Sequence, residues 1–217
     1  QNVNRQKIGA TIETPIFYPY LSGQKNLEIF CRIKKIPYSD IERVLHIVDL
    51  FERKRDAFKT YSLGMKQRLA IAGALLGEPE VLILDEPTNG LDIPSKRQFR
   101  RLLASVLTED RLFIIATHQI RDLESLIDPV VILDNGKIIF NHSLEKISKH
   151  LRVETMQTIP EGNHVLSSEK TIKGFKAVLA NSGETEGFID LETLFNTVIS
   201  NPEKVQSVFE KGVDHES

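Results

Sequence analysis

Two adjacent carboxylates follow a short apolar run in the middle of the chain. Asp85 and Glu86 come directly after Val81–Leu84, which is the kind of run that a parallel sheet buries. In open α/β sheets, ligands bind beyond the carboxyl ends of the strands. One carboxylate can hold Mg²⁺ there while the other activates a water molecule. We therefore expect Asp85 to be a metal ligand and Glu86 a general base. The alternative is a carboxylate pair that merely ends a strand.

Two other places carry side chains that suit phosphate chemistry. His118 follows the apolar run Ile114–Ala116, and a neutral imidazole can accept one hydrogen bond while it donates another. We expect His118 to approach a phosphate bound at this edge of the sheet. The alternative is a structural or solvated histidine. Ser62 and Gly64 precede a largely apolar helix, whose N-terminus offers free N–H groups and a positive dipole end to an anion. The alternative for this pair is a helix cap without a ligand.

The order of these segments resembles the nucleotide-binding domain of ABC transporters over about residues 7 to 141. LILDEP resembles the Walker B strand with its catalytic glutamate, and YSLGMKQRL resembles the signature loop. NGLD resembles the D-loop, and IIATH resembles the strand that ends in the switch histidine. The resemblance implies ATP and Mg²⁺ as cofactors and a P-loop NTPase-like fold. The signature departs from the usual LSGGQ, because only the serine and the second glycine are kept.

The resemblance also implies roles for residues that contact the nucleotide or the metal. Ser62 and Gly64 would contact ATP held by the opposite subunit. Asp92 matches the D-loop aspartate at the subunit interface, although it could instead cap the helix that begins near Ser95. Glu13 stands where the family usually has the Q-loop glutamine, and it could meet Mg²⁺. The alternative for Glu13 is an exposed loop acid.

One motif of the family does not occur in these residues. The phosphate loop, GxxxxGK followed by Ser or Thr, is absent from the 217 residues. Its backbone N–H groups and its lysine hold the nucleotide phosphates in the family. We therefore expect the sequence to be a fragment, with the first strands of the core and the phosphate loop before Gln1.

The composition is that of an ordinary globular protein. Hydrophobic residues make up 41% and charged residues 27%, with a net charge of −2. No basic face is evident, so we expect no nucleic acid partner. The single Cys31 excludes an internal disulfide. No apolar stretch reaches the roughly 20 residues that cross a bilayer. We therefore expect a cytoplasmic protein that lies on the inner face of the membrane through its partners.

The pattern of apolar residues predicts two domains. The α/β ATPase domain would span 1–141, lacking its N-terminal Walker A part, with a helical subdomain at about 20–77. Residues 151–217 would form a small α+β appendage. Within these regions, Ser39 to Glu42 has the form of a capping box. A hairpin is expected across Asn135-Gly136, between the apolar runs 130–133 and 138–140. A helix is expected over 190–199, and a charged tail is expected after Asn201-Pro202.

Two functional hypotheses follow from these features. The first is the ATPase subunit of an ABC exporter, in the branch that includes antibiotic and lantibiotic self-protection systems. It would work as a homodimer or heterodimer on transmembrane permease subunits. The second is a non-catalytic interaction module without a phosphate loop. Glu86 and His118 favour the enzyme, because a module needs neither. A soluble ABC ATPase acting on DNA or ribosomes is a weaker third hypothesis.

Overall fold

The computed structural model describes residues 7–108, 110–160, 162, 164–181 and 187–211. The chain forms two compact units, Gln1–Asp122 and Leu123–Ser217. The division falls after Asp122, whereas the sequence places the end of the first domain near residue 141. The domain assignment from sequence therefore stays a prediction, and each unit is described by itself.

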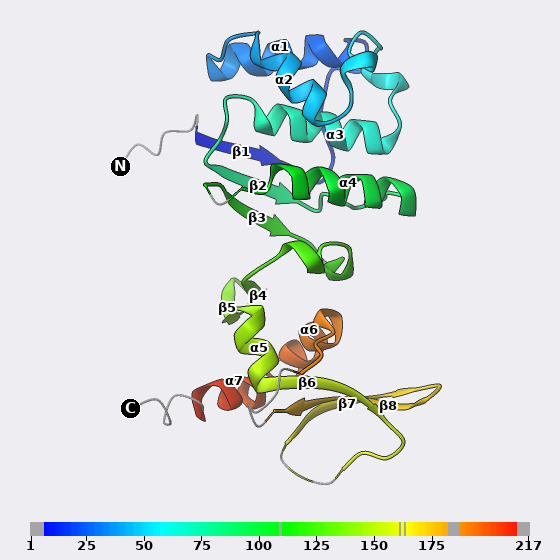
Figure 1. Ribbon diagram of the computed structural model, residues 1–217, viewed down its shortest axis with the longest axis vertical. Coiled ribbons are helices and arrows are strands. Elements are labelled where there is room, and N and C mark those ends of the chain that lie inside the picture. The colour runs from blue at the N-terminus through cyan, green and yellow to red at the C-terminus, as the bar shows by residue number, and fades with distance from the viewer. Residues whose placement is uncertain (1–6, 109, 161, 163, 182–186, 212–217) are drawn as a thin grey trace. The chain divides into compact units, whose positions relative to one another are not determined.

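A parallel sheet forms the centre of the first unit (Figure 1). Its strands, in spatial order, are β1 (Ile8–Thr11), β2 (Val81–Asp85) and β3 (Leu112–Ala116). The register places Thr11 beside Leu84 and Asp85 beside Ala116. All three strands therefore end at one edge of the sheet, where α/β proteins bind their ligands.

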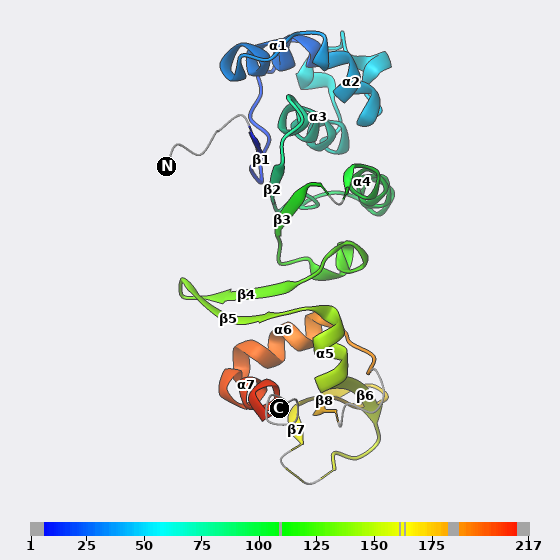
Figure 2. The same ribbon diagram turned by 60° about the vertical axis from the view of Figure 1, so that its left-hand side comes forward.

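Helices cover one face of this sheet. Figure 2 shows the sheet edge-on, with α3 (Leu63–Leu75) and α4 (Ile93–Val106) on the same side. Leu82 and Leu84 of β2 are fully buried, whereas Leu112 and Ile114 of β3 are 58% and 47% exposed. A strand alternates its side chains between the two faces. Among the described residues, one face is therefore packed and the other is only partly covered.

The remaining helices of this unit lie between β1 and α3 in the chain. They are α1 (Gly23–Lys34), α2 (Asp40–Ile47) and three-residue 3₁₀ helices at Phe51–Arg53 and Phe58–Thr60. A further 3₁₀ turn, Ile120–Asp122, closes the unit. The capping box expected at Ser39 is wrong. Ser39 has helical backbone angles and its side chain makes no cap hydrogen bond. Its neighbour Asp40 instead accepts hydrogen bonds from Arg43 and from the backbone N–H of Gly77.

The second unit begins with a 3₁₀ turn, Glu124–Leu126, and a β-hairpin. Strands β4 (Val130–Asp134) and β5 (Lys137–His142) are antiparallel. Asn135 and Gly136 between them have φ values of 46° and 76°. Positive φ at both central residues is what a type I′ turn requires. The hairpin predicted across Asn135-Gly136 is therefore confirmed.

The rest of the second unit combines an antiparallel sheet with three helices. The sheet has the order β6-β8-β7, formed by Leu151–Met156, Gly174–Ala180 and Val165–Thr171. Helices α5 (Leu144–His150), α6 (Leu191–Ser200) and α7 (Pro202–Lys211) complete it. The expected charged tail is wrong for residues 202–211. Pro202 opens a new helix, because its missing N–H is not needed at the first helical position. Val205 and Phe209 of this helix are buried. Among the described residues, no helix is both long and apolar enough to span a membrane.

Candidate functional site

The three strand ends of the first unit place the expected catalytic residues at one edge of the sheet. Asp85 is the last residue of β2, and Glu86 follows it. His118 stands two residues after β3, and Glu13 stands two residues after β1. Since parallel strands end at the same edge, residues distant in sequence meet there.

Glu86 and His118 are in direct contact. The Glu86 Oε1 atom accepts a hydrogen bond from the backbone N–H of His118 at 3.0 Å, and it lies 2.6 Å from the ring Nδ1. The hydroxyl of Thr117 donates to the other carboxylate oxygen, Oε2, at 3.1 Å. A carboxylate accepts from the ring only if Nδ1 carries a proton. In a neutral ring this contact places the proton on Nδ1 and leaves Nε2 as an acceptor.

The backbone at Glu86 is itself unusual. Its φ is 44°, a left-handed conformation that costs a non-glycine residue of the order of 1–3 kcal/mol. The N–H of Glu86 donates to the carbonyl of Ala116 at 2.8 Å. This bond fixes the turn immediately after β2. Strain of this kind gathers at active sites, where the surrounding structure maintains it.

Glu13 is held by two side-chain amides. The Nδ2 atom of Asn89 donates to the Glu13 carboxylate at 2.6 Å. Gln67 is 3% exposed, and its Nε2 atom donates to the backbone carbonyl of Glu13 at 3.2 Å. Asn89 belongs to the turn that follows Glu86, since its N–H donates to the Glu86 carbonyl at 3.1 Å. Through its contact with Asn89, the Glu13 side chain lies against that turn.

A chain of polar side chains continues from this contact. Gln119 donates from Nε2 to Asn89 Oδ1 at 3.3 Å, and Lys96 donates to Gln119 Oε1 at 2.8 Å. Asn89 lies within the NGLD segment, Gln67 lies within YSLGMKQRL, and Gln119 follows His118. Their places within or beside a motif are the only signal that the sequence offers, and the contacts among them come from the structure.

The N-termini of α3 and α4 adjoin each other. Ser62 caps α3, because its hydroxyl accepts from the N–H of Met65 at 3.3 Å. A Cβ atom added at Gly64 would lie 3.0 Å from the Ser95 hydroxyl, so a larger residue would crowd α4. Ser62 and Gly64 therefore stand at an exposed helix start, and their contact with a nucleotide stays a prediction.

Asp92 caps α4. Its carboxylate accepts from the N–H of Ser95 at 2.9 Å. Hydrogen bonds from the side chain and the backbone of Ser95 hold the pKa of Asp92 below its ordinary value. The capping role considered for Asp92 is thus present in the structure. An exposed carboxylate at this position can also face a second subunit, which stays a prediction.

The donor atoms at the sheet edge suit Mg²⁺. Asp85 is exposed at the tip of β2, and Glu13 is exposed in the loop after β1. No group of three or more acidic, histidine or cysteine side chains that could hold a metal occurs in the described part of the chain. Mg²⁺ commonly takes one or two carboxylates and completes its shell with phosphate and water. The side chains present therefore fit a cation that arrives with a nucleotide.

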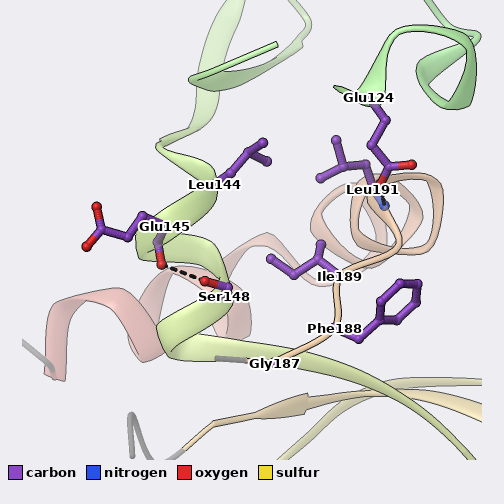
Figure 3. Close-up of a pocket in the computed structure, with 8 residues that line it drawn as sticks. All are labelled: Glu124, Leu144, Glu145, Ser148, Gly187, Phe188, Ile189 and Leu191. Carbon is purple, nitrogen blue, oxygen red and sulfur yellow. Dashed lines mark hydrogen bonds between the residues drawn. The ribbon is translucent and has the colours of Figure 1, made fainter. Parts of the chain in front are cut away.

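A cavity of about 450 Å³ lies elsewhere, in the second unit. Figure 3 shows it between α5 and the segment before α6, lined by Glu124, Leu144, Phe188 and Leu191 among others. Glu124 accepts a hydrogen bond from the N–H of Leu191 at 3.4 Å. None of the residues expected to bind nucleotide lines this cavity.

Part of the chain matches a known protein family. The sequence model of the ABC transporter family matches residues 2–89. The Bacitracin transport ATP-binding protein BcrA of Enterococcus faecalis is 37% identical over 158 residues, which cover 72% of this chain and 51% of that protein. The Lantibiotic transport ATP-binding protein SrtF of Streptococcus pyogenes is 38% identical over 134 residues, which cover 62% of this chain and 58% of that protein.

A solved structure shares the fold. The structure of cbiO1 from Clostridium perfringens, part of the ABC transporter complex cbiONQ, aligns with a TM-score of 0.58 at 30% identity. The alignment covers 64% of this chain and 58% of that one. This likeness confirms the expected fold class, an α/β core of the ABC ATPase type.

The chain spans about half the length of the curated relatives that it matches, 51% for BcrA and 58% for SrtF. The similarity therefore concerns a part of those proteins. Residues 2–89 belong to the ABC transporter family, and the chain is homologous to ABC transporter ATP-binding proteins that include bacitracin and lantibiotic transport proteins.

Proposed function

We propose that this chain is part of the ATP-binding and ATP-hydrolysing subunit of an ABC-type exporter. The observation that carries the proposal is the contact between Glu86 and His118 at the end of the parallel sheet. It joins the residue expected to activate water with the residue expected to sense the terminal phosphate. The relatives named for bacitracin and lantibiotic transport support an exporter of related antibiotics.

Glu86 acts in this proposal as the general base. Both hydrogen bonds of His118 go to Oε1, so that oxygen has used its two acceptor positions. Oε2 accepts from Thr117 and keeps one acceptor position among the described residues. An attacking water can donate to that position, and a positioned base contributes about 10²–10⁴ in rate. His118 presents its Nε2 atom away from Glu86, toward a nucleotide.

Asp85 and Glu13 hold the metal in this proposal, Asp85 through water. A bound Mg²⁺ supplies charge neutralisation for the phosphate oxygens. Ser62, Gly64 and Asp92 belong to a second face, where the start of α3 meets ATP held by another subunit. The active assembly is then a homodimer or heterodimer of ATP-binding subunits.

The membrane-spanning part of the transporter belongs to permease subunits in this proposal, and the chain lies on the cytoplasmic face of the membrane. The cbiO1 relative, described as part of a transporter complex, supports such partners. The alternative of a non-catalytic interaction module is not favoured. The matched relatives carry ATP-binding names, and a module would not need the contact between Glu86 and His118.

Hydrolysis of Mg-ATP by the full-length protein tests the proposal. The parent should release phosphate, and His118→Ala should lower the turnover number about 100-fold. A matched control is His46→Ala, because His46 stacks on Phe51 in the helical region. Equal turnover in the two histidine variants, or none in the parent, would contradict the proposal.

A further inference from the structure

Gln119 is linked through hydrogen bonds to the partners of two carboxylates at the sheet edge, those of Glu86 and Glu13. Its backbone N–H donates to Thr117, and its side-chain amide donates to Asn89. We propose that Gln119 is a positioning residue that holds the carboxylates of Glu86 and Glu13 in a fixed relation to each other. The inference rests on the proposed function, which gives those two carboxylates the roles of base and metal ligand.

The backbone of Gln119 is tied to Glu86 through one hydroxyl. Its N–H donates to Thr117 Oγ1 at 2.9 Å, and the same hydroxyl donates to Glu86 Oε2 at 3.1 Å. A hydroxyl has one proton to donate. Because that proton goes to the carboxylate, the bond from Gln119 must use a lone pair of the oxygen. The direction of both bonds is thereby fixed.

The side chain of Gln119 is tied to Glu13 through one amide. Gln119 Nε2 donates to Asn89 Oδ1 at 3.3 Å, and Asn89 Nδ2 donates to Glu13 Oε1 at 2.6 Å. At the other end, Lys96 donates to Gln119 Oε1 at 2.8 Å. A lysine can only donate and an ionised carboxylate can only accept. The two charged ends therefore determine which way both amides point.

These two hydrogen bonds explain why a glutamine suits position 119. The position needs an acceptor toward Lys96 and a donor toward Asn89 at the end of one side chain. A glutamate has the same shape but offers only acceptors. Gln119→Glu would keep the bond to Lys96 and set a carboxylate against the carbonyl oxygen of Asn89. If Asn89 turned its amide to compensate, its carbonyl would face the carboxylate of Glu13.

The linkage can be tested on the 217-residue chain by the NMR signals of side-chain amides. Glu13→Ala should shift the signals of both the Asn89 and the Gln119 amide, because the change passes along the chain of hydrogen bonds. Glu28→Ala is the matched control, since Glu28 accepts from the Gln24 amide at 3.3 Å. It should leave the Asn89 and Gln119 signals in place. A Gln119 signal that does not move in Glu13→Ala would overturn the linkage.

The positioning role is tested by the kinetics of the full-length protein. Gln119→Glu should lower kcat about tenfold to a hundredfold with little change in KM for ATP, because small misplacement of reacting groups costs that much. The control is Gln206→Glu, which removes the same kind of donor from an exposed pair with Glu210. It should keep the kcat of the parent.

Exchanging the amide and the carboxylate of the Asn89–Glu13 pair provides a rescue experiment for kcat. Asn89→Asp alone would set two carboxylates against each other and should lower kcat. Adding Glu13→Gln restores a donor opposite an acceptor, so the double variant should recover the kcat of Glu13→Gln. If the parent hydrolyses ATP while Gln119→Glu keeps its kcat, the positioning role is wrong and the proposed function stands. If the parent does not hydrolyse ATP, both are wrong.

Discussion

The Oε1 atom of Glu86 receives the backbone N–H of His118 at 3.0 Å and faces its ring Nδ1 at 2.6 Å. His118 thus contacts the carboxylate of Glu86, the proposed base, at two points, through its backbone N–H and through its ring. The two contacts orient the carboxylate, and in a neutral ring they place the proton on Nδ1. The two carboxylate oxygens thereby differ. Both contacts with His118 are made by Oε1, whereas Oε2 accepts only from Thr117 among the described residues and can also accept from water.

Glu13 should serve coupling more than hydrolysis. Its carboxylate joins the loop after β1 to Asn89 in the turn after β2. Glu13→Gln keeps an oxygen ligand and removes one charge, so basal ATPase should stay within about tenfold, or roughly 1.4 kcal/mol of barrier. Glu13→Ala should reduce transport more than basal turnover. The measurements are ATPase of the purified complex and export or resistance in cells.

The control for this prediction is Glu52→Ala, which removes an exposed acid from a 3₁₀ turn of the helical region. It should change neither activity. A proportional fall of transport and ATPase in Glu13→Ala would contradict the coupling role and leave Glu13 only the role of a metal ligand.

Ser62 allows the cap of α3 to be separated from contact with a second subunit. Asp is as good an N-cap as Ser, so Ser62→Asp should keep the thermal stability of the parent. Its negative charge should repel the phosphates of ATP held by another subunit and prevent ATP-dependent dimers. Sedimentation of the full-length protein with ATP in a Glu86→Gln background would measure this.

Ser143→Asp is the matched control, because Ser143 caps α5 in the same way, accepting from the N–H of Lys146 at 3.2 Å. Dimers should form normally in that variant. Undiminished ATP-dependent dimers in Ser62→Asp would speak against the contact between subunits.

The 217-residue chain should bind Mg-ATP only weakly. The phosphate loop motif does not occur in its sequence, so the phosphates lack their backbone cradle and lysine. We expect a Kd of about 1 mM or weaker, equivalent to roughly −4 kcal/mol, in a calorimetric titration. Micromolar binding would show that the nucleotide site lies elsewhere.

Asp190 makes the stability of the second unit depend on pH. Burial raises its pKa, but hydrogen bonds from Lys176 at 2.7 Å and from the N–H of Thr193 at 2.8 Å together outweigh burial and lower the pKa to about 2. The ionised form is therefore favoured in the folded state. Its contribution is complete above the ordinary value of 3.8 and is lost as the pH falls toward about 2.

Asp190→Asn should thus lower the free energy of unfolding by about 1 kcal/mol at pH 7, after allowance for solvent screening, and by less at pH 3. Lys176→Met should reduce the same dependence, because it removes the cation. Denaturant titrations at the two pH values provide the measurement. A loss that is equal at pH 7 and pH 3 would show that the charge of Asp190 does not matter.

Individual strands and turns could be predicted from local sequence, whereas the polar chain could not. The apolar run Val81–Leu84 and the Asn135-Gly136 turn each carry a strong local signal, and both form as expected. Lys96, Asn89 and Glu13 come together from three separate segments. Only the register of the parallel strands brings those segments to one edge.

At Ser39 and at Pro202 the structure differs from the local sequence pattern for identifiable reasons. The pattern at Ser39 satisfies a capping box, but tertiary partners hold the adjacent Asp40 and the serine remains helical. Asn201-Pro202 ends α6 as expected, but a proline also suits the first turn of a helix, so α7 forms in place of the expected charged tail. At both positions a tertiary contact decides between two local structures that the same sequence pattern allows.

Steady-state phosphate release by full-length protein carrying Glu86→Gln tests the general-base role most directly, with ATP affinity measured on the same preparation. The substitution keeps the shape and removes the base, so turnover should fall about 100-fold or more while the Kd for ATP stays within about threefold. The matched control is Glu80→Gln, at the other end of the same strand, where the carboxylate pairs with Lys7. It should hydrolyse ATP like the parent. Phosphate release by Glu86→Gln within about threefold of the parent would contradict the account.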